Sequence, residues 1–446
     1  MTLSQAGAWL AQLVIGFSAT FSGMNPGTVA MKDRADYLTG AKPLRIGIAM
    51  NVQRARLICD TAATVTDAEG KELAQLTAQQ PLVCQIAQGA IRLEEGAAGQ
   101  QVSGLSLTPA SAQATTSVTS PYGGGSRRQY RGKLEVSLSS AGALIVVNAV
   151  SLEDYVAGVA PGEMPGMFPL EALKAQAIIA RTYSLITIGK HAAEGFDLCS
   201  GVHCQVYVGA GRGRDTHREA VQATAGKVLT YKGYLAETFF HGDCGGTTEY
   251  PWYIWWGTLV PYLGRVPDTA GRLPALDSNQ AVAKYLASEQ PVYCAKSPSH
   301  RWEVSFTKAQ AEDLVRRNLP KLLHDPALQP GTVTDFEVGP RSATGRVQEL
   351  RIITDKNTYR LQCNEIRWLF GLGYAAPQGL KSILFTLTTE RDAAGKPAKF
   401  TFRGAGWGHG LGLCQYGAAG RARAGQTATQ ILEAYYPGTK VQTVNR

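Results

Sequence analysis

The sequence predicts an α+β protein in which mixed and antiparallel strands surround a central helix. Three observations point to this class. Short stretches of alternating hydrophobicity recur, a long helical pattern follows a strand-rich region, and further strand and helix patterns come after it. The chain has 446 residues, of which 44% are hydrophobic and 18% charged. It can therefore bury a sizeable core, and global disorder is not expected.

Residues 1–43 are expected to form a signal or N-terminal segment. Ala8 to Phe21 is an apolar stretch of signal-peptide size, and Thr28 to Ala30 can end a cleavage site. No Lys or Arg precedes Lys32, so a packed N-terminal helix or a misassigned start is the alternative. No later segment reaches the roughly 18 apolar residues that a membrane span needs. We therefore expect export to the periplasm or cell envelope, with no transmembrane span after the N-terminus.

The next region, residues 44–107, is predicted to be small and β-rich. Residues 108–128 are rich in Ser, Thr, Pro and Gly, which is typical of a linker or loop. Two β-hairpins follow, one within residues 130–152 and one within 226–240. Residues 333–362 are strand-rich, and the predicted helices further along the chain are Ser278–Ser288, Lys308–Asn318 and Ala428–Tyr435.

The central helix is predicted within the stretch EMPGMFPLEALKAQAIIARTYSL, residues 163–185. Pro169 suits a first helical position, and Glu171 in the first turn favours the helix dipole. One face carries small and apolar residues at helical spacing, namely Leu170, Leu173, Ala177, Ala180 and Ser184. A second stripe carries Lys174 and Arg181, which the residue pattern alone assigns to a solvated face.

Glu163 stands before this helix, within PGEMPG. Pro165 biases Met164 away from helical geometry, so we expect a stiff turn that projects Glu163 in a fixed direction. From composition alone, a surface turn glutamate is the alternative to a catalytic one.

Residues 152–185, LEDYVAGVAPGEMPGMFPLEALKAQAIIARTYSL, resemble the SpoIID/LytB family, named for stage II sporulation protein D. Its members share a strand ending in Glu-Asp-Tyr, a Glu-Met-Pro turn, and a helix with Ala-Leu-Lys-Ala-Gln-Ala and Ala-Arg-Thr-Tyr. The second family signature is a Gly-His-Gly loop followed by Gln-Tyr-Gly-Ala, which matches GWGHGLGLCQYGA at residues 406–418. The resemblance implies a SpoIID-like catalytic domain over residues 129–446, with an inserted or accessory segment around 260–375.

The resemblance also implies lytic transglycosylase activity on peptidoglycan glycan strands, with Glu163 as the acid. One carboxylate can suffice, because the carbon-6 hydroxyl of the substrate replaces the nucleophile that ordinary glycoside hydrolases provide. Such an acid needs a raised pKa, and Met164, Tyr155 and Phe168 are expected to form the apolar wall that raises it. Substrate-binding residues are expected among Tyr155, Lys174, Arg181, His409, Gln415 and Tyr416.

Glycines stand at every even position from Gly404 to Gly412, which permits close approach of the backbone to a ligand. Trp407 offers a sugar-stacking face. From the residues alone, a tight turn with a structural histidine accounts for the same pattern.

A cluster of Cys and His lies at residues 191–204, where His191, Cys199, His203 and Cys204 are ligand types suited to Zn²⁺. The family resemblance implies a structural zinc site in this loop. His203 adjoins Cys204, and adjacent side chains often point apart, so Cys244 or His241 is an alternative ligand. A Cys199–Cys204 disulfide and free thiols are further alternatives. Elsewhere, Cys59/Cys84 and Cys294/Cys363 are candidate disulfides, but pairing does not follow from sequence.

Two other functions compete with transglycosylase activity. One is a glycan-binding module that enhances a cell-wall amidase, and the other is a hydrolase with Cys204 or Cys244 as nucleophile. The net charge of +9 suits an anionic polymer such as cell wall or nucleic acid. The basic residues form no concentrated run, so a nucleic-acid partner is not expected.

Overall fold

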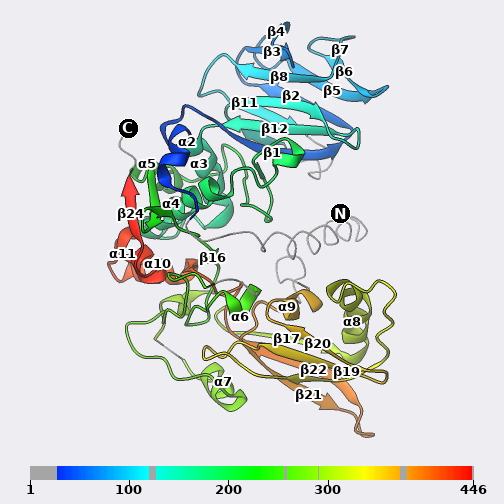
Figure 1. Cartoon of the computed structure of the whole chain (residues 1–446), viewed down its shortest axis with the longest axis vertical. Coiled ribbons are helices and arrows are strands. Elements are labelled where there is room, and N and C mark those ends of the chain that lie inside the picture. Colours follow the sequence, from blue (N-terminus) through cyan, green and yellow to red (C-terminus); the bar gives the residue numbers. More distant parts are fainter. Residues whose placement is uncertain (1–27, 120–126, 256–258, 290, 372–378, 444–446) are drawn as a thin grey trace. The chain divides into compact units, whose positions relative to one another are not determined.

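The computed structural model describes residues 28–119, 127–255, 259–289, 291–371 and 379–443. Residues 1–27 of the expected signal or N-terminal segment lie outside these ranges, whereas residues 28–43 lie within them. The chain divides into two compact units (Figure 1). The first takes in the described parts of Gly27–Glu237 and Lys440–Arg446, and the second takes in those of Thr238–Thr439. Both contain helices and sheets, which confirms the α+β class.

The first unit is built on two larger sheets and one small one. The larger sheets have the strand orders β13-β1-β12-β11-β8-β3-β4 and β10-β9-β2-β5-β6-β7, and the small one has the order β15-β14-β24. The strands are β1 (Leu44–Val52), β2 (Arg54–Cys59), β3 (Ala63–Asp67), β4 (Glu72–Leu76), β5 (Pro81–Ala87), β6 (Ala90–Glu95), β7 (Gln101–Val102), β8 (Gly104–Pro109), β9 (Thr116–Thr119), β10 (Arg128–Tyr130), β11 (Lys133–Leu138), β12 (Leu144–Val150), β13 (Leu198–Cys199), β14 (Lys227–Tyr231), β15 (Tyr234–Leu235) and β24 (Lys440–Thr443).

The sequence predicts a separate β-rich region at residues 44–107, but in the structure these residues do not form one. β1 pairs antiparallel with β12, and β8 pairs antiparallel with β11, so the early strands share a sheet with the predicted hairpin of β11 and β12. β12 is buried along its whole length, so both faces of the sheet are covered at this strand. The expected linker at 108–128 also contributes to a sheet, since β9 pairs with both β2 and β10.

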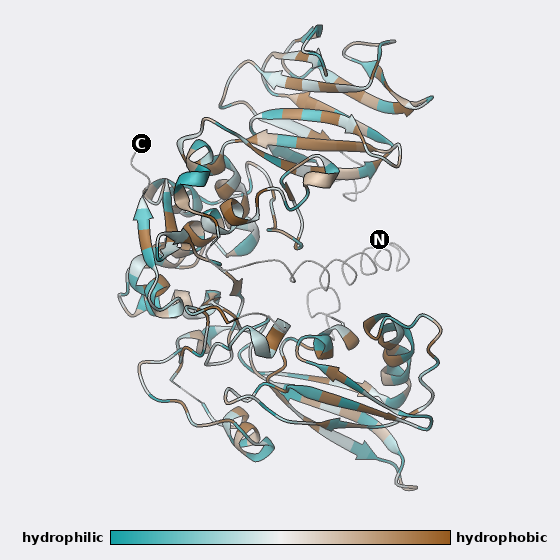
Figure 2. Cartoon of the chain, viewed as in Figure 1, coloured by the Kyte–Doolittle hydropathy of each residue, from teal (hydrophilic) through white to brown (hydrophobic). Residues whose placement is uncertain are grey.

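The helices of the first unit are η1 (Met31–Arg34), α2 (Ala35–Thr39), α3 (Leu152–Glu163), α4 (Leu170–Thr187), η3 (Ala192–Glu194) and α5 (Asp215–Ala223). α4 packs against α3, α5 and β14, which makes it the central helix that the sequence predicted. Its alanines at 172, 175, 177 and 180 are fully buried, because small side chains let neighbouring backbones approach closely. In Figure 2, apolar and polar residues alternate along many strands of this unit, as expected for sheets with one covered face.

The second unit contains three small sheets, with the strand orders β17-β22-β21, β18-β19-β20 and β16-β23. Its elements are β16 (Phe240–His241), α6 (Trp252–Trp255), α7 (Asn279–Leu286), η4 (Tyr293–Lys296), β17 (Trp302–Thr307), α8 (Lys308–Leu322), β18 (Val333–Val338), β19 (Glu349–Thr354), β20 (Thr358–Gln362), α9 (Glu365–Leu369), β21 (Phe385–Arg391), β22 (Pro397–Gly404), β23 (Leu413–Cys414), α10 (Gln415–Arg423) and α11 (Ala428–Tyr435). α7, α8 and α11 lie where the sequence predicted helices. A cluster of phenylalanine rings forms the core, namely Phe306, Phe336, Phe370, Phe385, Phe400 and Phe402.

No helix in the described parts of the chain combines the length and apolar character that a membrane crossing requires.

Candidate active site

Glu163 is the last residue of α3, and this corrects the expectation that it stands in a free turn. The Glu-Asp-Tyr sequence that was expected to end a strand also lies in this helix, whose first turn is capped by the Ser151 side chain. Pro161 lies inside the helix and does not end it. Met164 is extended, with φ −135° and ψ 134°, as the following proline requires. The helix therefore stops directly after Glu163.

The Glu163 carboxyl group lies in a mostly dehydrated environment. Burial raises its pKa from 4.5 to about 7, and the Val206 backbone N–H, which donates to Oε1 at 2.7 Å, opposes that rise. Tyr155, Met164 and Phe168, the expected wall residues, are all buried. A carboxyl group with this pKa is substantially protonated near neutral pH and can act as an acid.

Close packing fixes the end of α3. A Cβ atom at Gly162 would lie 2.5 Å from the Val206 carbonyl oxygen, so only glycine lets the two segments approach this closely. The buried His217 side chain, on α5, donates from Nε2 to the Met164 carbonyl at 2.9 Å, while its Nδ1 accepts the Arg214 N–H at 3.1 Å. No local pattern in the sequence links His217 to Glu163, so its role is visible only in the fold.

Tyr183, on α4, is a second residue that sequence reasoning missed. Burial raises the pKa of its phenol, and the charge of Glu163 contributes to that rise. The phenol is therefore neutral and near the acid. Tyr183 ends the family motif Ala-Arg-Thr-Tyr, and this motif is the sequence signal that could have identified it.

Three expected substrate-binding residues of this unit have other partners. Arg181 is fully buried, and its Nε and Nη2 donate to the two carboxylate oxygens of Glu153 at 2.9 and 2.7 Å. It therefore lies neither on a solvated face nor on an open substrate surface, because it joins α4 to α3 inside the unit. Lys174 forms an ion pair with Glu171 at 2.7 Å. Tyr155 is fully buried, so it belongs to the wall rather than to an open subsite.

The four predicted metal ligands converge in the first unit. The ligand atoms of His191, Cys199, His203 and Cys204 all lie within 4.8 Å of one another. Nδ1 of His203 is 3.1 Å from Nε2 of His191 and 3.8 Å from each sulfur, so His203 faces the cluster despite adjoining Cys204. Nδ1 of His191 contacts Glu194 at 2.7 Å, the kind of outer contact that orients a ligating histidine. Two thiols and two imidazoles at this separation fit Zn²⁺.

All eight cysteines are free in the structure. Cys244 lies with Asp243, Cys294 and Cys414 in the second unit, and it is fully buried, which argues against a nucleophile. Cys294 lies 3.7 Å from Cys244, sulfur to sulfur, rather than beside Cys363. The candidate pair Cys294/Cys363 is thus not supported.

The glycine loop is packed within the second unit, which changes the physical reason for its glycines. Cβ atoms at Gly408 and Gly412 would lie 2.7 Å from the His241 side chain and 2.1 Å from the Phe239 carbonyl oxygen. Both glycines also have positive φ, at 116° and 64°. Protein neighbours rather than a ligand therefore account for the absence of side chains at these positions.

His409, in the same loop, is half-buried among aromatic rings. Its ring centroid lies 4.7 Å from that of Trp255 and 5.4 Å from that of His241. Nδ1 accepts the Leu411 N–H at 3.0 Å, and burial holds its pKa well below the usual value. The imidazole is therefore neutral. Gln415 and Tyr416 begin α10 just beyond the loop and are partly exposed. All three lie in the second unit and Glu163 in the first, so a shared site remains a prediction.

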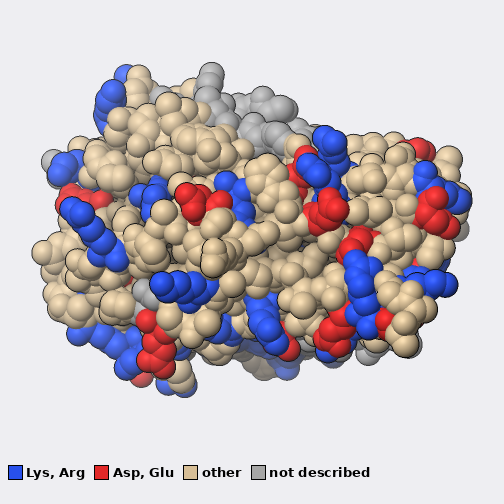
Figure 3. Space-filling model, turned by 90° about the horizontal axis from the view of Figure 1, so that it is seen from below, with Lys and Arg blue, Asp and Glu red and all other residues tan. Residues whose placement is uncertain are grey.

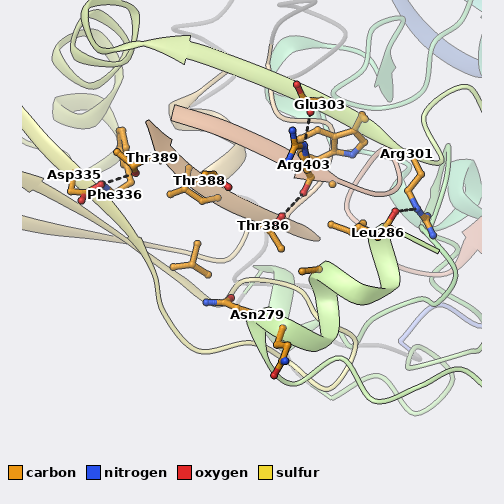
Figure 4. A pocket seen from close by; sticks show the side chains of 17 residues that line it. Asn279, Leu286, Arg301, Glu303, Asp335, Phe336, Thr386, Thr388, Thr389 and Arg403 are labelled. Carbon is orange, nitrogen blue, oxygen red and sulfur yellow. Dashed lines mark hydrogen bonds and ion pairs between the residues drawn. The ribbon is translucent and has the colours of Figure 1, made fainter. Parts of the chain in front are cut away.

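The second unit also has an open groove of about 900 Å³, which Figure 4 shows from close by. It is lined by residues of α7 and of the sheet β17-β22-β21, including the Glu303–Arg403 ion pair of 2.6 Å. None of the predicted site residues lines it. On the face of the molecule drawn in Figure 3, basic and acidic side chains are interspersed.

Comparison with known proteins identifies the two parts of the chain. The sequence profile of the stage II sporulation protein family matches residues 140–231, which hold Glu163 and the Cys/His cluster. The chain belongs to the stage II sporulation protein D family. A domain of unknown function matches residues 250–412, so most of the second unit corresponds to a recognised but uncharacterised domain.

Several relatives of this family member span much of the chain. It is 30% identical to an uncharacterised protein of Brachyspira hyodysenteriae over 304 residues, which cover 68% of this chain and 70% of that protein. It is 28% identical to stage II sporulation protein D of Bacillus subtilis, with 66% and 75% covered. It is 31% identical to the amidase enhancer of Bacillus subtilis, where the match covers 63% of this chain but 39% of the enhancer.

Proposed function

We propose that this protein is a peptidoglycan lytic transglycosylase in which Glu163 acts first as acid and then as base. The observation that carries the proposal is the partly buried carboxyl group at the end of α3, whose pKa is raised to about 7 by desolvation. A surface glutamate would be ionised at neutral pH and could not protonate a leaving group. Membership of the stage II sporulation protein D family, and a relative named amidase enhancer, support a role in the cell wall.

The proposed substrate is the bond between N-acetylmuramic acid and N-acetylglucosamine in a glycan strand. Glu163 gives its proton to the glycosidic oxygen as the bond from that oxygen to carbon 1 of the muramic acid breaks. The carbon-6 hydroxyl of the same sugar then bonds to carbon 1, and Glu163 takes its proton. The product is a 1,6-anhydromuramic acid end, and the acid is regenerated without water.

Local contacts support this cycle. The Val206 N–H donates to Oε1 in either protonation state, so it can hold the carboxyl group in place throughout. His217 braces Met164, which keeps the helix end from moving as the charge changes. Zinc held by His191, Cys199, His203 and Cys204 would serve as a structural cross-link, because the proposed reaction needs no metal. A glycan-cleaving role of this kind places the protein in the cell envelope.

Mass spectrometry of products from purified glycan strands tests the proposal. Wild type should produce anhydro ends and Glu163→Gln should not. Glu171→Gln is the matched control, because Glu171 is a glutamate of the same unit. Reducing ends would indicate a hydrolase instead. Strands with and without stem peptides should be compared, since the proposal does not specify which form is cleaved.

A second candidate is a non-enzymatic enhancer of a cell-wall amidase, and the named relative favours it. Under this alternative, strands bind but remain uncut, and amidase activity rises equally with wild type and Glu163→Gln. Measuring cleavage and amidase stimulation in the same preparations separates the two candidates.

A further inference from the structure

A second cluster of potential metal ligands lies inside the second unit, apart from the Cys/His cluster of the first. It consists of Asp243, Cys244, Cys294 and Cys414, whose ligand atoms all lie within 4.8 Å of one another. Each of the four residues is at most 2% exposed. Three thiols and a carboxyl group gathered out of water require a physical reason, because buried polar groups are normally paired.

The four residues come from three segments that are distant in sequence. Asp243 and Cys244 follow β16, Cys294 lies in η4, and Cys414 ends β23 and caps α10. β16 and β23 are parallel neighbours, with His241 opposite Cys414, and η4 packs against α10. The fold of the unit therefore brings the cluster together.

Backbone N–H groups surround the sulfur atoms. Cys414 Sγ accepts from the N–H groups of Cys244 and Gly417, each at 3.2 Å. Cys244 Sγ accepts from the N–H of Gly246 at 3.4 Å. Donors directed at sulfur favour the thiolate, which is the form that binds metal.

The Asp243 carboxyl group supplies a second, independent observation that points to a bound ligand. Its Oδ1 accepts the Gly245 N–H at 2.8 Å, whereas its buried Oδ2 has no hydrogen-bond partner. The Nδ1 atom of His300 lies 3.7 Å from Oδ2 and also 3.7 Å from Cys294 Sγ. Nε2 of His300 faces the Arg301 guanidinium at 3.0 Å, and arginine can only donate, so the proton of a neutral His300 sits on Nδ1. Nδ1 can therefore donate to Cys294 Sγ as an outer contact, whereas at 3.7 Å it lies beyond hydrogen-bond distance of Asp243 Oδ2, which is left for the metal.

We propose that Cys244, Cys294 and Cys414, with Oδ2 of Asp243, bind one Zn²⁺ in a closed structural site. Three thiolates and one carboxylate supply the four ligands of a tetrahedral zinc site, and full burial leaves no open position for substrate. Two buried guanidinium groups lie near this ligand set, each one contact removed from a ligating sulfur. Arg346 donates to the Cys244 carbonyl at 2.9 Å, and Arg421 donates to Asp268, whose Oδ2 lies 3.6 Å from Cys244 Sγ.

The site would hold the glycine loop in position. Asp243 and Trp407 exchange two backbone hydrogen bonds of 3.0 and 2.7 Å, and Cys414 follows the loop directly. A metal bound to Asp243 and Cys414 thus ties down both sides of the loop that carries His409. This role depends neither on the proposed transglycosylase activity nor on the first cluster.

A disulfide and a set of inert thiols both account for this cluster less well than a metal does. A Cys244–Cys294 disulfide would need the sulfur atoms, now 3.7 Å apart, to close to about 2.05 Å, and it would leave Cys414 and Asp243 unaccounted for. Inert buried thiols would not explain why backbone N–H groups point at the sulfur atoms, or why Oδ2 of Asp243 is buried without a hydrogen-bond partner.

Elemental analysis of the full chain, purified without chelator, tests the proposal. If both clusters bind zinc, wild type holds two equivalents, Cys294→Ala and Cys199→Ser each hold one, and the double variant holds none. Cys363→Ala is the matched control, since Cys363 is another buried cysteine of the second unit and should lose no metal. If Cys294→Ala keeps the full wild-type metal content, the proposal is overturned.

A measurement on wild type covers the case in which the cluster variants fail to fold. Cadmium-113 NMR of the cadmium-exchanged chain should show a resonance with the shift of a three-sulfur site, in addition to that of a two-sulfur, two-nitrogen site. Absence of the three-sulfur resonance, or a Cys244–Cys294 disulfide found by mass mapping under non-reducing conditions, would overturn the proposal. Neither readout depends on glycan cleavage, so failure of the proposed function is detected separately.

Discussion

The backbone N–H of Val206 donates a 2.7 Å hydrogen bond to the carboxylate of Glu163, and Val206 follows Cys204 by only two residues. One short segment therefore serves both the predicted metal cluster and the proposed acid. Gly162 and Val206 also pack closely, so displacement of this segment would disturb the end of α3.

Glu163→Gln should reduce glycan cleavage by about 10²- to 10⁴-fold, because the amide cannot donate the proton that a catalytic acid supplies. Circular dichroism should show an unchanged fold, since glutamine can still accept the Val206 N–H. Glu171→Gln should cleave normally. A Glu163→Gln rate within about twofold of wild type would remove Glu163 from the mechanism.

The same carboxyl group should make both rate and stability depend on pH. Its pKa is raised from 4.5 to about 7, so folding favours the protonated form. Ionising the buried carboxyl group lowers the free energy of unfolding. This loss is absent below the pKa of the unfolded state, grows as pH rises, and is complete above about pH 7. At pH 8, Glu163→Gln should therefore exceed wild type in free energy of unfolding, by up to about 3 kcal/mol. Cleavage by wild type should fall about tenfold per pH unit above 7.

Urea denaturation of both proteins at pH 5 and pH 8 measures the stability difference. The stability advantage of Glu163→Gln should be much smaller at pH 5 than at pH 8. An equal difference at the two pH values would show that the carboxyl group titrates normally.

Removal of zinc from the first cluster should lower the melting temperature and slow cleavage. A structural zinc contributes directly to folding, and here its loss would release the segment that holds Val206 against Glu163. Cys199→Ser should lose one equivalent of zinc, whereas Cys59→Ala, at a buried cysteine of the same unit outside the cluster, should lose none. Wild type without zinc, but with a mapped Cys199–Cys204 disulfide, would support the covalent alternative.

Arg181→Met should destabilise the first unit by about 3 kcal/mol, because it leaves the Glu153 carboxylate without its buried partner. Lys174→Met is the matched control on the same helix. Its partly exposed pair with Glu171 should contribute less than about 1 kcal/mol. Chemical denaturation measures both. If Arg181→Met instead raised KM with unchanged stability, the sequence-based prediction that Arg181 binds substrate would stand.

His409→Ala should lower the stability of the second unit and weaken glycan binding, while the pH dependence due to Glu163 persists. The ring packs against Trp255, and its Nδ1 accepts the Leu411 N–H, so its loss should loosen the loop. His324→Ala, an exposed histidine of the same unit, is the control. Binding to immobilised glycan strands and thermal unfolding measure the two effects. Wild-type behaviour in both would show that the loop acts independently of this ring.

Several local features of this protein were readable from its sequence, although the helix α3 was not. The alanine-rich pattern predicted α4, Pro165 predicted an extended Met164, and the spacing of His191, Cys199 and Cys204 predicted a cluster. Each of these signals lies within one continuous segment, where backbone preference and short spacing dominate. The two family motifs likewise identified Glu163 as the residue to test.

Other features were decided by the tertiary structure alone. Arg181 and Lys174 lie at helical spacing on α4, yet Arg181 is buried and Lys174 is partly exposed. The difference arises because Glu153, on a second helix, lies beside Arg181. Cys244, Cys294 and Cys414 meet because strand pairing and helix packing join segments up to 170 residues apart. No local pattern encodes such contacts, since their free energy comes from burial and pairing with residues that only the complete fold brings into reach.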